Sequence, residues 1–247
     1  MTRLFAAELL KLRTLRSTWG FGLVALLLAG VATAGNIGGT PERDRLEPEF
    51  QFRIVLDAAF PAALLALLMG MVLVTNEFRH GTIARTLLAT PRRGRLLATK
   101  LLAGAATGVG LMLVTFVVTA AVAVVWLGII DIPLELGEVA DAAGRAFVGA
   151  ALAGLLGAAV GGAVHSQVGA LVGGLVWIFV AEPLCWVLLG LLDLDAVARY
   201  LPAAALGSIV DSSGEGLPFA GSVGMAFAWI ALATVLALLR TRRRDIT

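Results

Sequence analysis

Residues 101–130 read LLAGAATGVGLMLVTFVVTAAVAVVWLGII and contain no charged side chain. An α-helix crosses the hydrocarbon core of a bilayer with about 20 apolar residues, so this stretch is long enough to span the core and to tilt within it. Backbone polar groups cannot remain unpaired in lipid, and the stretch lacks the alternation of apolar and polar residues that barrel strands show. It therefore predicts a transmembrane α-helix.

Five further apolar runs lie on either side of this stretch. Together they predict six transmembrane helices, at residues 19–35, 54–75, 101–130, 145–164, 168–191 and 222–239. Hydrophobic residues make up 59% of the 247-residue chain and charged residues only 15%, which is too little polar surface for a soluble globule of this size. We therefore predict an all-α integral membrane protein in which residues 1–247 form a single domain.

The orientation of these helices is predicted from the segments that flank them. Residues 1–18, 76–100 and 240–247 hold 14 of the 19 Lys and Arg residues but only three of the 17 Asp and Glu residues. Because loops rich in Lys and Arg stay in the cytoplasm, these three segments, and with them both chain ends, are predicted to be cytoplasmic. Arg outnumbers Lys by 17 to two among many Ala, Gly, Leu and Val residues, which is typical of a GC-rich bacterium. We therefore expect a multi-pass protein of a bacterial cytoplasmic membrane.

The first 18 residues are predicted to form a helix on the cytoplasmic face of the membrane. Phe5, Leu9 and Leu12 share one side of this helix. A charged segment that only fixes the topology is an alternative interpretation. A signal peptide is another, because a basic leader precedes an apolar run at residues 21–31 and small residues at 32–34.

Several kinds of catalytic site are missing from the sequence. It contains no G-x-x-x-x-G-K-[ST] stretch, so the chain has no P-loop with which to bind and hydrolyse ATP. His80 and His165 are far apart, and the single cysteine, Cys185, lies in an apolar run, so the spacing of a metal site is absent. The excess of Lys and Arg over Asp and Glu is explained by the predicted cytoplasmic loops, so we expect no nucleic-acid binding. We predict neither an enzyme activity nor a cofactor on this chain.

Glu182 is the only carboxylate deep within a predicted span, and Pro183 follows it. Ionisable groups inside a bilayer are costly and mark functional sites more often than elsewhere. Glu182 is interpreted either as a residue near the outer interface at a helix break or as a polar contact for a substrate or a partner subunit.

Glycine pairs spaced four residues apart occur in three of the predicted spans. Such pairs let neighbouring helices approach closely, so they predict a tight bundle. They are Gly104 with Gly108, Gly157 with Gly161, and Gly169 with Gly173.

The loop after the second predicted span carries apolar residues that a solvated loop would not need. Within residues 76–95, one side of a short predicted helix is formed by Ile83, Leu87 and Leu88, and Pro91 ends it. The apolar face of an amphipathic helix has to be covered, so the pattern predicts docking onto a partner. The arginines of the same loop are interpreted equally well as topology signals that contact anionic lipid.

At this loop the sequence resembles the permease subunits of type-2 ABC exporters. In that family the second span is followed by Glu, Gly-Thr, Leu, Pro, Arg and a later Lys, seen here as Glu77, Gly81-Thr82, Leu87-Leu88, Pro91, Arg93 and Lys100. The opening residues 8–14, ELLKLRT, are similar to the family's N-terminal connecting helix. Tyr200-Leu201-Pro202 resembles the segment before its sixth span, so the resemblance covers the whole chain.

The resemblance implies that two cytoplasmic loops act as coupling helices on a separate ATP-binding subunit. The coupling residues it implies are Glu77, Phe78, Arg79, His80, Gly81, Thr82, Leu87, Leu88, Pro91, Arg93 and Lys100, with His165, Ser166 and Gln167 in the second loop. It assigns Glu8, Lys11 and Arg13 to the connecting helix, which Glu77 would tie to the first coupling helix. The alternative for Glu77 is a carboxylate favoured by a helix dipole. Residues 192–221 would form an outer re-entrant loop.

In function, the resemblance implies the permease of an ATP-driven exporter. Its expected partners are two copies of an ATP-binding subunit that carry ATP and Mg²⁺, a second permease copy that is identical or a close paralogue, and membrane lipids. A substrate cavity would lie between facing second and fifth spans, lined by Phe60, Met69, Trp177, Phe179 and Glu182. For these five residues, helix packing or lipid contact is the alternative. An ATP-independent secondary transporter and a scaffold subunit without transport are the alternatives for the function.

Overall fold

Helices account for every regular element of the described chain. The computed structural model describes residues 2–14, 16–41, 44–46, 49–82, 93–132, 136–211 and 216–243, and within these ranges it has no β-strand. Six stretches of helix there are long and apolar enough to cross a membrane. These findings confirm the predicted all-α fold with six long apolar helices. The cytoplasmic orientation of the chain ends stays a prediction.

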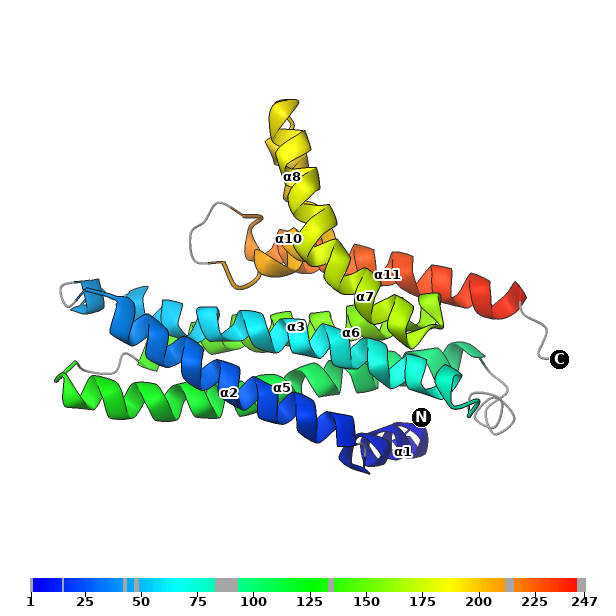
Figure 1. The fold of residues 1–247 in the computed structure, drawn as a ribbon, viewed down its shortest axis with the longest axis horizontal. Coiled ribbons are helices and arrows are strands. Elements are labelled where there is room, and N and C mark those ends of the chain that lie inside the picture. The colour runs from blue at the N-terminus through cyan, green and yellow to red at the C-terminus, as the bar shows by residue number, and fades with distance from the viewer. Residues whose placement is uncertain are drawn as a thin grey trace.

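The described helices follow one another along the chain with few residues between them. In order they are α1 (Thr2–Thr14), α2 (Arg16–Gly39), η1 (Asp44–Leu46), α3 (Glu49–Arg79), α5 (Arg93–Ile129), α6 (Leu136–Val164), α7 (Gln167–Val176), η2 (Trp177–Ala181), α8 (Glu182–Leu191), α9 (Asp195–Ala198), α10 (Pro202–Gly207) and α11 (Phe219–Arg243). Figure 1 shows α2, α3, α5 and α6 running along the long axis of the bundle, with α11 on the side away from α2. The helix α1, the end of α3 and the end of α11 lie toward the same end of the bundle (Figure 1).

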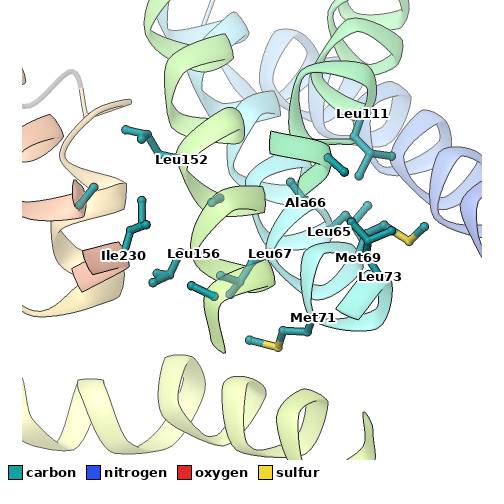
Figure 2. Packing of buried hydrophobic residues seen from close by; sticks show 14 of the residues in the cluster. Leu65, Ala66, Leu67, Met69, Met71, Leu73, Leu111, Leu152, Leu156 and Ile230 are labelled. Atoms are coloured by element: carbon teal, nitrogen blue, oxygen red, sulfur yellow. The ribbon is translucent and has the colours of Figure 1, made fainter. Parts of the chain in front are cut away.

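The central helix of the bundle is α3. It packs against α6 and α5, and 72% of its most apolar segment is buried. Figure 2 shows Leu65 and Met69 on one side of α3 and Leu67 and Met71 on another. A helix that is apolar all round needs neighbours on every side, and α3 obtains them from α2, α5, α6 and α7.

Glycine allows α3, α5 and α6 to touch through their backbones. A Cβ atom at Gly157 of α6 would fall on the carbonyl oxygen of Leu67 in α3, and one at Gly108 of α5 on the carbonyl oxygen of Ala150 in α6. The first two predicted glycine pairs therefore lie at tight helix contacts. The third pair differs, because a Cβ atom at Gly173 of α7 would meet no atom within 4 Å.

Two helices extend into the segment that was predicted as a loop over residues 76–100. The helix α3 continues to Arg79 and α5 begins at Arg93, so Glu77 and Lys100 are helical rather than in a loop. Both side chains are buried by packing at the ends of these helices, which explains why the helices extend past the apolar runs. Residues 83–92, with Leu87, Leu88, Pro91 and the short predicted helix, lie outside the described residues.

The fifth apolar segment leaves the bundle. Its parts α7, η2 and α8 follow without a break, and Figure 1 shows the α8 end projecting away from the other helices. Only 6% of its most apolar window is buried, against 72% in α3. The π-helical turn η2 lies just before Pro183, whose missing N–H interrupts the regular hydrogen bonds of the helix. After α8, the short helices α9 and α10 return the chain to α11, within the predicted outer loop at 192–221.

Candidate functional site

Four charged side chains meet where α1, α3 and α5 come together. Lys11 Nζ in α1 donates one hydrogen bond of 2.9 Å to Glu8 Oε1 and another of 2.9 Å to Glu77 Oε1 in α3. Lys100 Nζ in α5 lies 2.7 Å from Glu77 Oε1 and 3.6 Å from Glu8 Oε1. We call these four residues the charge cluster. It joins the N-terminal helix to both helices that flank the first predicted coupling loop.

The charge cluster is electrically balanced and largely buried. Glu8, Glu77 and Lys100 are 3%, 7% and 2% exposed, whereas the side chain of Lys11 is 45% exposed. Within the described part of the chain, the Oε2 atoms of both carboxylates are buried without a hydrogen-bond partner. The carboxylates therefore depend on the two ammonium groups for compensation of their charge.

The cluster also changes the acidity of its most exposed member, Lys11. Partial burial lowers the pKa of the Lys11 ammonium, but hydrogen bonds to Glu77 and Glu8 and the charges of both carboxylates oppose it. Their combined effect raises the pKa of Lys11 above its ordinary value. Lys11 is therefore charged throughout the physiological range, and α1 is held by an ion pair rather than by apolar contact alone.

Directly after the cluster, α3 ends in a turn that requires glycine. The amide of Gly81 donates to the carbonyl oxygen of Phe78 (3.3 Å), and the amide of Thr82 donates to the carbonyl oxygen of Glu77 (3.0 Å). These two bonds form a Schellman motif, in which Gly81 has a φ of +65°. Glycine adopts this left-handed conformation without a Cβ penalty. The Gly81-Thr82 pair thus fixes the direction in which the chain leaves α3.

The two predicted coupling segments contact each other. The rings of Phe78, at the end of α3, and His165, before α7, meet edge to face with their centroids 4.3 Å apart. Arg79 Nη1 donates a hydrogen bond of 3.1 Å to Gln167 Oε1. The end of α3 and the start of α7 are therefore joined by two side-chain contacts, which we call the α3–α7 junction.

The turn at residues 165–167 is shaped by local hydrogen bonds. His165 has a φ of +61°, which reverses the chain after α6, and Ser166 Oγ accepts a hydrogen bond of 3.2 Å from the amide of Gly169. Ser166 is thereby the N-cap of α7. Arg240 Nη1 of α11 donates to the carbonyl oxygen of Ala163 (2.7 Å) in the last turn of α6. Four helices, α3, α6, α7 and α11, are thus tied together at this end.

Two other predicted residues, His80 and Arg13, lie outside these contacts. The ring of His80 is exposed, and its Nδ1 lies 2.9 Å from the carbonyl oxygen of Asn76 in the same helix. Arg13 is exposed, and its carbonyl oxygen accepts a hydrogen bond of 3.2 Å from Trp19 Nε1. Arg93 is the first residue of α5.

The residues predicted to line a substrate cavity are not brought together in the single chain. Phe60 and Phe179 are exposed by 52% and 55%, whereas Met69 is fully buried in the packing of α3. Trp177 and Glu182 are joined by a hydrogen bond of 2.6 Å from Trp177 Nε1 to Glu182 Oε2. The cavity prediction concerns a pair of chains and stays a prediction.

Glu182 caps the N-terminal end of a short helix that comes later in the chain, α10. Its Oε2 accepts a hydrogen bond from the amide of Ala203 (3.0 Å), and its Oε1 accepts one from the amide of Ala204 (2.6 Å). Both amides belong to the first turn of α10, where backbone donors have no partner within the helix. The buried carboxylate therefore caps α10 and joins it to the start of α8 and, through Trp177, to η2. Sequence reasoning missed this role, because the amides follow Glu182 by about 20 residues.

Neither cluster has the composition of a metal centre. Among the residues that the structure describes, no three His, Cys, Asp or Glu side chains are grouped so that they could hold a metal ion. The charge cluster contains paired opposite charges, and the α3–α7 junction contains an edge-to-face ring pair and a hydrogen bond from Arg79 to Gln167. Such contacts fix the positions of helices relative to one another.

The model of the family described as "ABC-2 family transporter protein" matches residues 4–160, from α1 to the last turn of α6, and therefore more than half of the 247 residues. The matched part contains all four residues of the charge cluster. No curated protein matches the chain. The resemblance to this family is thereby confirmed, and the chain belongs to the ABC-2 family of transporter proteins.

Proposed function

We propose that this chain is the permease subunit of an ATP-driven exporter in a bacterial cytoplasmic membrane. Two copies would work with two copies of a separate ATP-binding subunit, which binds ATP and Mg²⁺. Membership of the ABC-2 transporter family supports a role as a membrane transporter permease. The observation that carries the coupling part of the proposal is the α3–α7 junction, which joins the two segments on which the ATP-binding subunit would act.

Movement would pass from the ATP-binding subunit to the membrane helices along two routes. A push on the chain just after α3 reaches α7 through the Phe78–His165 contact, and it reaches α1 and α5 through the charge cluster. ATP shifts the permease between conformations only if it binds one of them better. Contacts at the α3–α7 junction would transmit the effect of this difference in ATP affinity to α7.

The exposed fifth helix supports a second copy of the chain as partner. The segment α7–η2–α8 is the least buried of the six candidate spans, and it extends beyond the bundle (Figure 1). In a pair, this helix and Phe60 of α3 would contribute the apolar surface around a shared path. Phe179 and Trp177 would contribute to the same surface.

The coupling is tested by substitution of Phe78 in the assembled transporter. The chain is co-expressed with an ATP-binding subunit, purified, and reconstituted into vesicles. We expect Phe78→Ala to leave the complex assembled but to lower transport-coupled ATPase activity roughly three- to tenfold, because an aromatic pair contributes about 0.5–1.5 kcal/mol. Phe116→Ala is the matched control, since Phe116 pairs with Phe147 between α5 and α6, with centroids 6.1 Å apart. Transport by the chain in the absence of any ATP-binding subunit would contradict the proposal.

The pairing is tested with the only native cysteine. Cys185 lies in α8 and is partly exposed, so a short bis-maleimide should join two copies through this residue in native membranes. Cys185→Ser should abolish the product. A cysteine placed at Gly110 of α5, in the Cys185→Ser background, should give none, because α5 lies on the other side of the bundle (Figure 1). Equal cross-linking at both positions would indicate random collision and would argue against a pair built on α8.

A further inference from the structure

An apolar cavity of about 330 Å³ lies between α3, α6, α7, α10 and α11. Its floor is formed by buried side chains that include Leu67 and Met71 of α3 and Leu156 of α6. Figure 2 shows Met71 extending away from α3 toward the helix at the lower edge of the view. The exposed members of the wall are Leu232 and Leu236 of α11, Gly169 and Gly173 of α7, and Trp177 of η2. The cavity therefore opens sideways, between α7 and α11.

The cavity exists because several wall positions in α7 are glycines, and their missing side chains leave space between α7 and the neighbouring helices. A Cβ atom at Gly173 would meet nothing within 4 Å, although Gly173 is part of the cavity wall. At Gly174, by contrast, a Cβ atom would lie 2.7 Å from Met71 Cε. Gly173 therefore borders open space at the mouth of the cavity. We expect a larger side chain at that position to extend into this mouth.

This cavity offers water few hydrogen-bond partners. The wall is apolar, and the indole N–H groups of its two tryptophans point to other acceptors. Trp177 Nε1 donates to Glu182 Oε2 (2.6 Å), and Trp229 Nε1 donates to the carbonyl oxygen of Tyr200 (2.8 Å). A buried water needs two to four polar partners, and apolar cavities stay dry or take up hydrocarbon. An engineered cavity of about half this volume binds benzene.

The position of the cavity among the membrane-spanning helices indicates which hydrocarbon it would take up. Apart from those of α10, the wall residues belong to helices that are long and apolar enough to span a membrane, and the open side between α7 and α11 would therefore face the acyl region of the bilayer. One end of the mouth has a cationic group that can pair with a phosphate. This group is Arg240, which follows Leu236 by one helical turn in α11. Its guanidinium reaches the carbonyl oxygen of Ala163, next to the wall residue Val164.

We infer that the cavity binds one acyl chain of a bilayer phospholipid, with the lipid phosphate at Arg240. The volume holds on the order of ten methylene groups if each takes about as much space as a water molecule in the liquid, roughly 30 Å³. Burial of each methylene is favourable, and the guanidinium adds attraction for the anionic phosphate. The bound chain would fill the space between α7 and α11 and so support the part of α7 that contacts α3.

The test counts phospholipids that stay with the protein. The full chain is purified in a mild detergent and delipidated by repeated gel filtration, and the retained molecules are counted by native mass spectrometry. We expect about one phospholipid per chain to resist removal from the wild type. Gly173→Leu should weaken retention at least tenfold, because the leucine occupies the cavity. Gly110→Leu is the matched control, since a Cβ atom at Gly110 in α5 also meets nothing within 4 Å, and it should retain the lipid.

A second pair of variants keeps the test decisive if Gly173→Leu does not fold. Arg240→Gln should weaken retention roughly fivefold through loss of the phosphate contact, whereas Arg199→Gln, at an exposed arginine just after α9, should have no effect. The inference is overturned if the wild type retains no phospholipid, if Gly173→Leu retains as much as Gly110→Leu, or if Arg240→Gln and Arg199→Gln behave alike. It is also overturned if the retained molecule is not a phospholipid, or if cross-linking of two copies expels it, because the second copy would then be the occupant.

Discussion

Substitution of Lys100 by Met removes one ammonium from the charge cluster and leaves two buried carboxylates with one cation. Lys100 is 2% exposed, and its Nζ lies 2.7 Å from Glu77 Oε1 and 3.6 Å from Glu8 Oε1. Methionine retains most of the packing of the lysine stem, so the loss is chiefly one of charge compensation. Removal of one partner from a buried ion pair costs about 3–5 kcal/mol. We therefore expect Lys100→Met to lower the free energy of unfolding by about that amount.

Lys11→Met is the matched control, because Lys11 contacts the same two carboxylates. Its side chain is 45% exposed, so water can partly replace it, and exposed pairs contribute about 1 kcal/mol or less. Stability is measured by reversible unfolding in mixed micelles, followed by tryptophan fluorescence. Release of α1 is measured by trypsin cleavage after Arg13, which should be much faster in Lys100→Met than in Lys11→Met. Equal losses in the two variants would refute the reasoning that burial sets the cost.

The remaining predictions concern other contacts of the bundle. Gly157→Ala should destabilise the protein by about 1–3 kcal/mol in the same unfolding assay, because its Cβ would overlap the carbonyl oxygen of Leu67, whereas Gly173→Ala should change stability by less than about 0.5 kcal/mol. Glu182→Gln should speed hydrogen exchange of the α10 amides on the order of tenfold, since a neutral amide replaces the carboxylate that caps them; unchanged exchange would show that the cap is dispensable. The raised pKa of Lys11 means that its ion pair contributes fully below the ordinary lysine pKa of 10.5 and is lost as the pH rises through the higher folded-state value. Trypsin sensitivity after Arg13 should therefore increase only above about pH 10.5, and an increase between pH 6 and 9 would contradict this assignment.

The helical part of the fold could be predicted because length and apolarity decide it. The run 101–130 lies within α5, and all six apolar runs correspond to helices long enough to span a membrane. The ends of the helices were predicted less accurately from apolarity, because Glu77 and Lys100 are helical although both carry charge. Their charges compensate each other and those of Glu8 and Lys11 in α1, which is far away in the sequence. Local composition does not contain that information.

The candidate site was predictable only in part. The family pattern pointed to Glu77, Gly81 and Lys100, but not to the ion pairs among Glu8, Lys11, Glu77 and Lys100, because such pairs depend on how three helices are placed. The Schellman turn had a local signal, a glycine just past the end of a periodic segment. The Phe78–His165 contact joins the ends of α3 and α6 and carries no signal in either segment alone.

The wide separation of the cluster residues along the chain sets an order of events during synthesis. Glu8 and Lys11 are made first, and Glu77 follows Lys11 by 66 residues, with Lys100 later still. At about 5–20 residues per second, the ribosome needs on the order of ten seconds to complete the set. During that interval the N-terminal helix has only its own Glu8–Lys11 pair, so it stays in water or at the lipid surface. The cluster can be completed only after Lys100, near the start of α5, has been made, so α1 cannot take its final position before then.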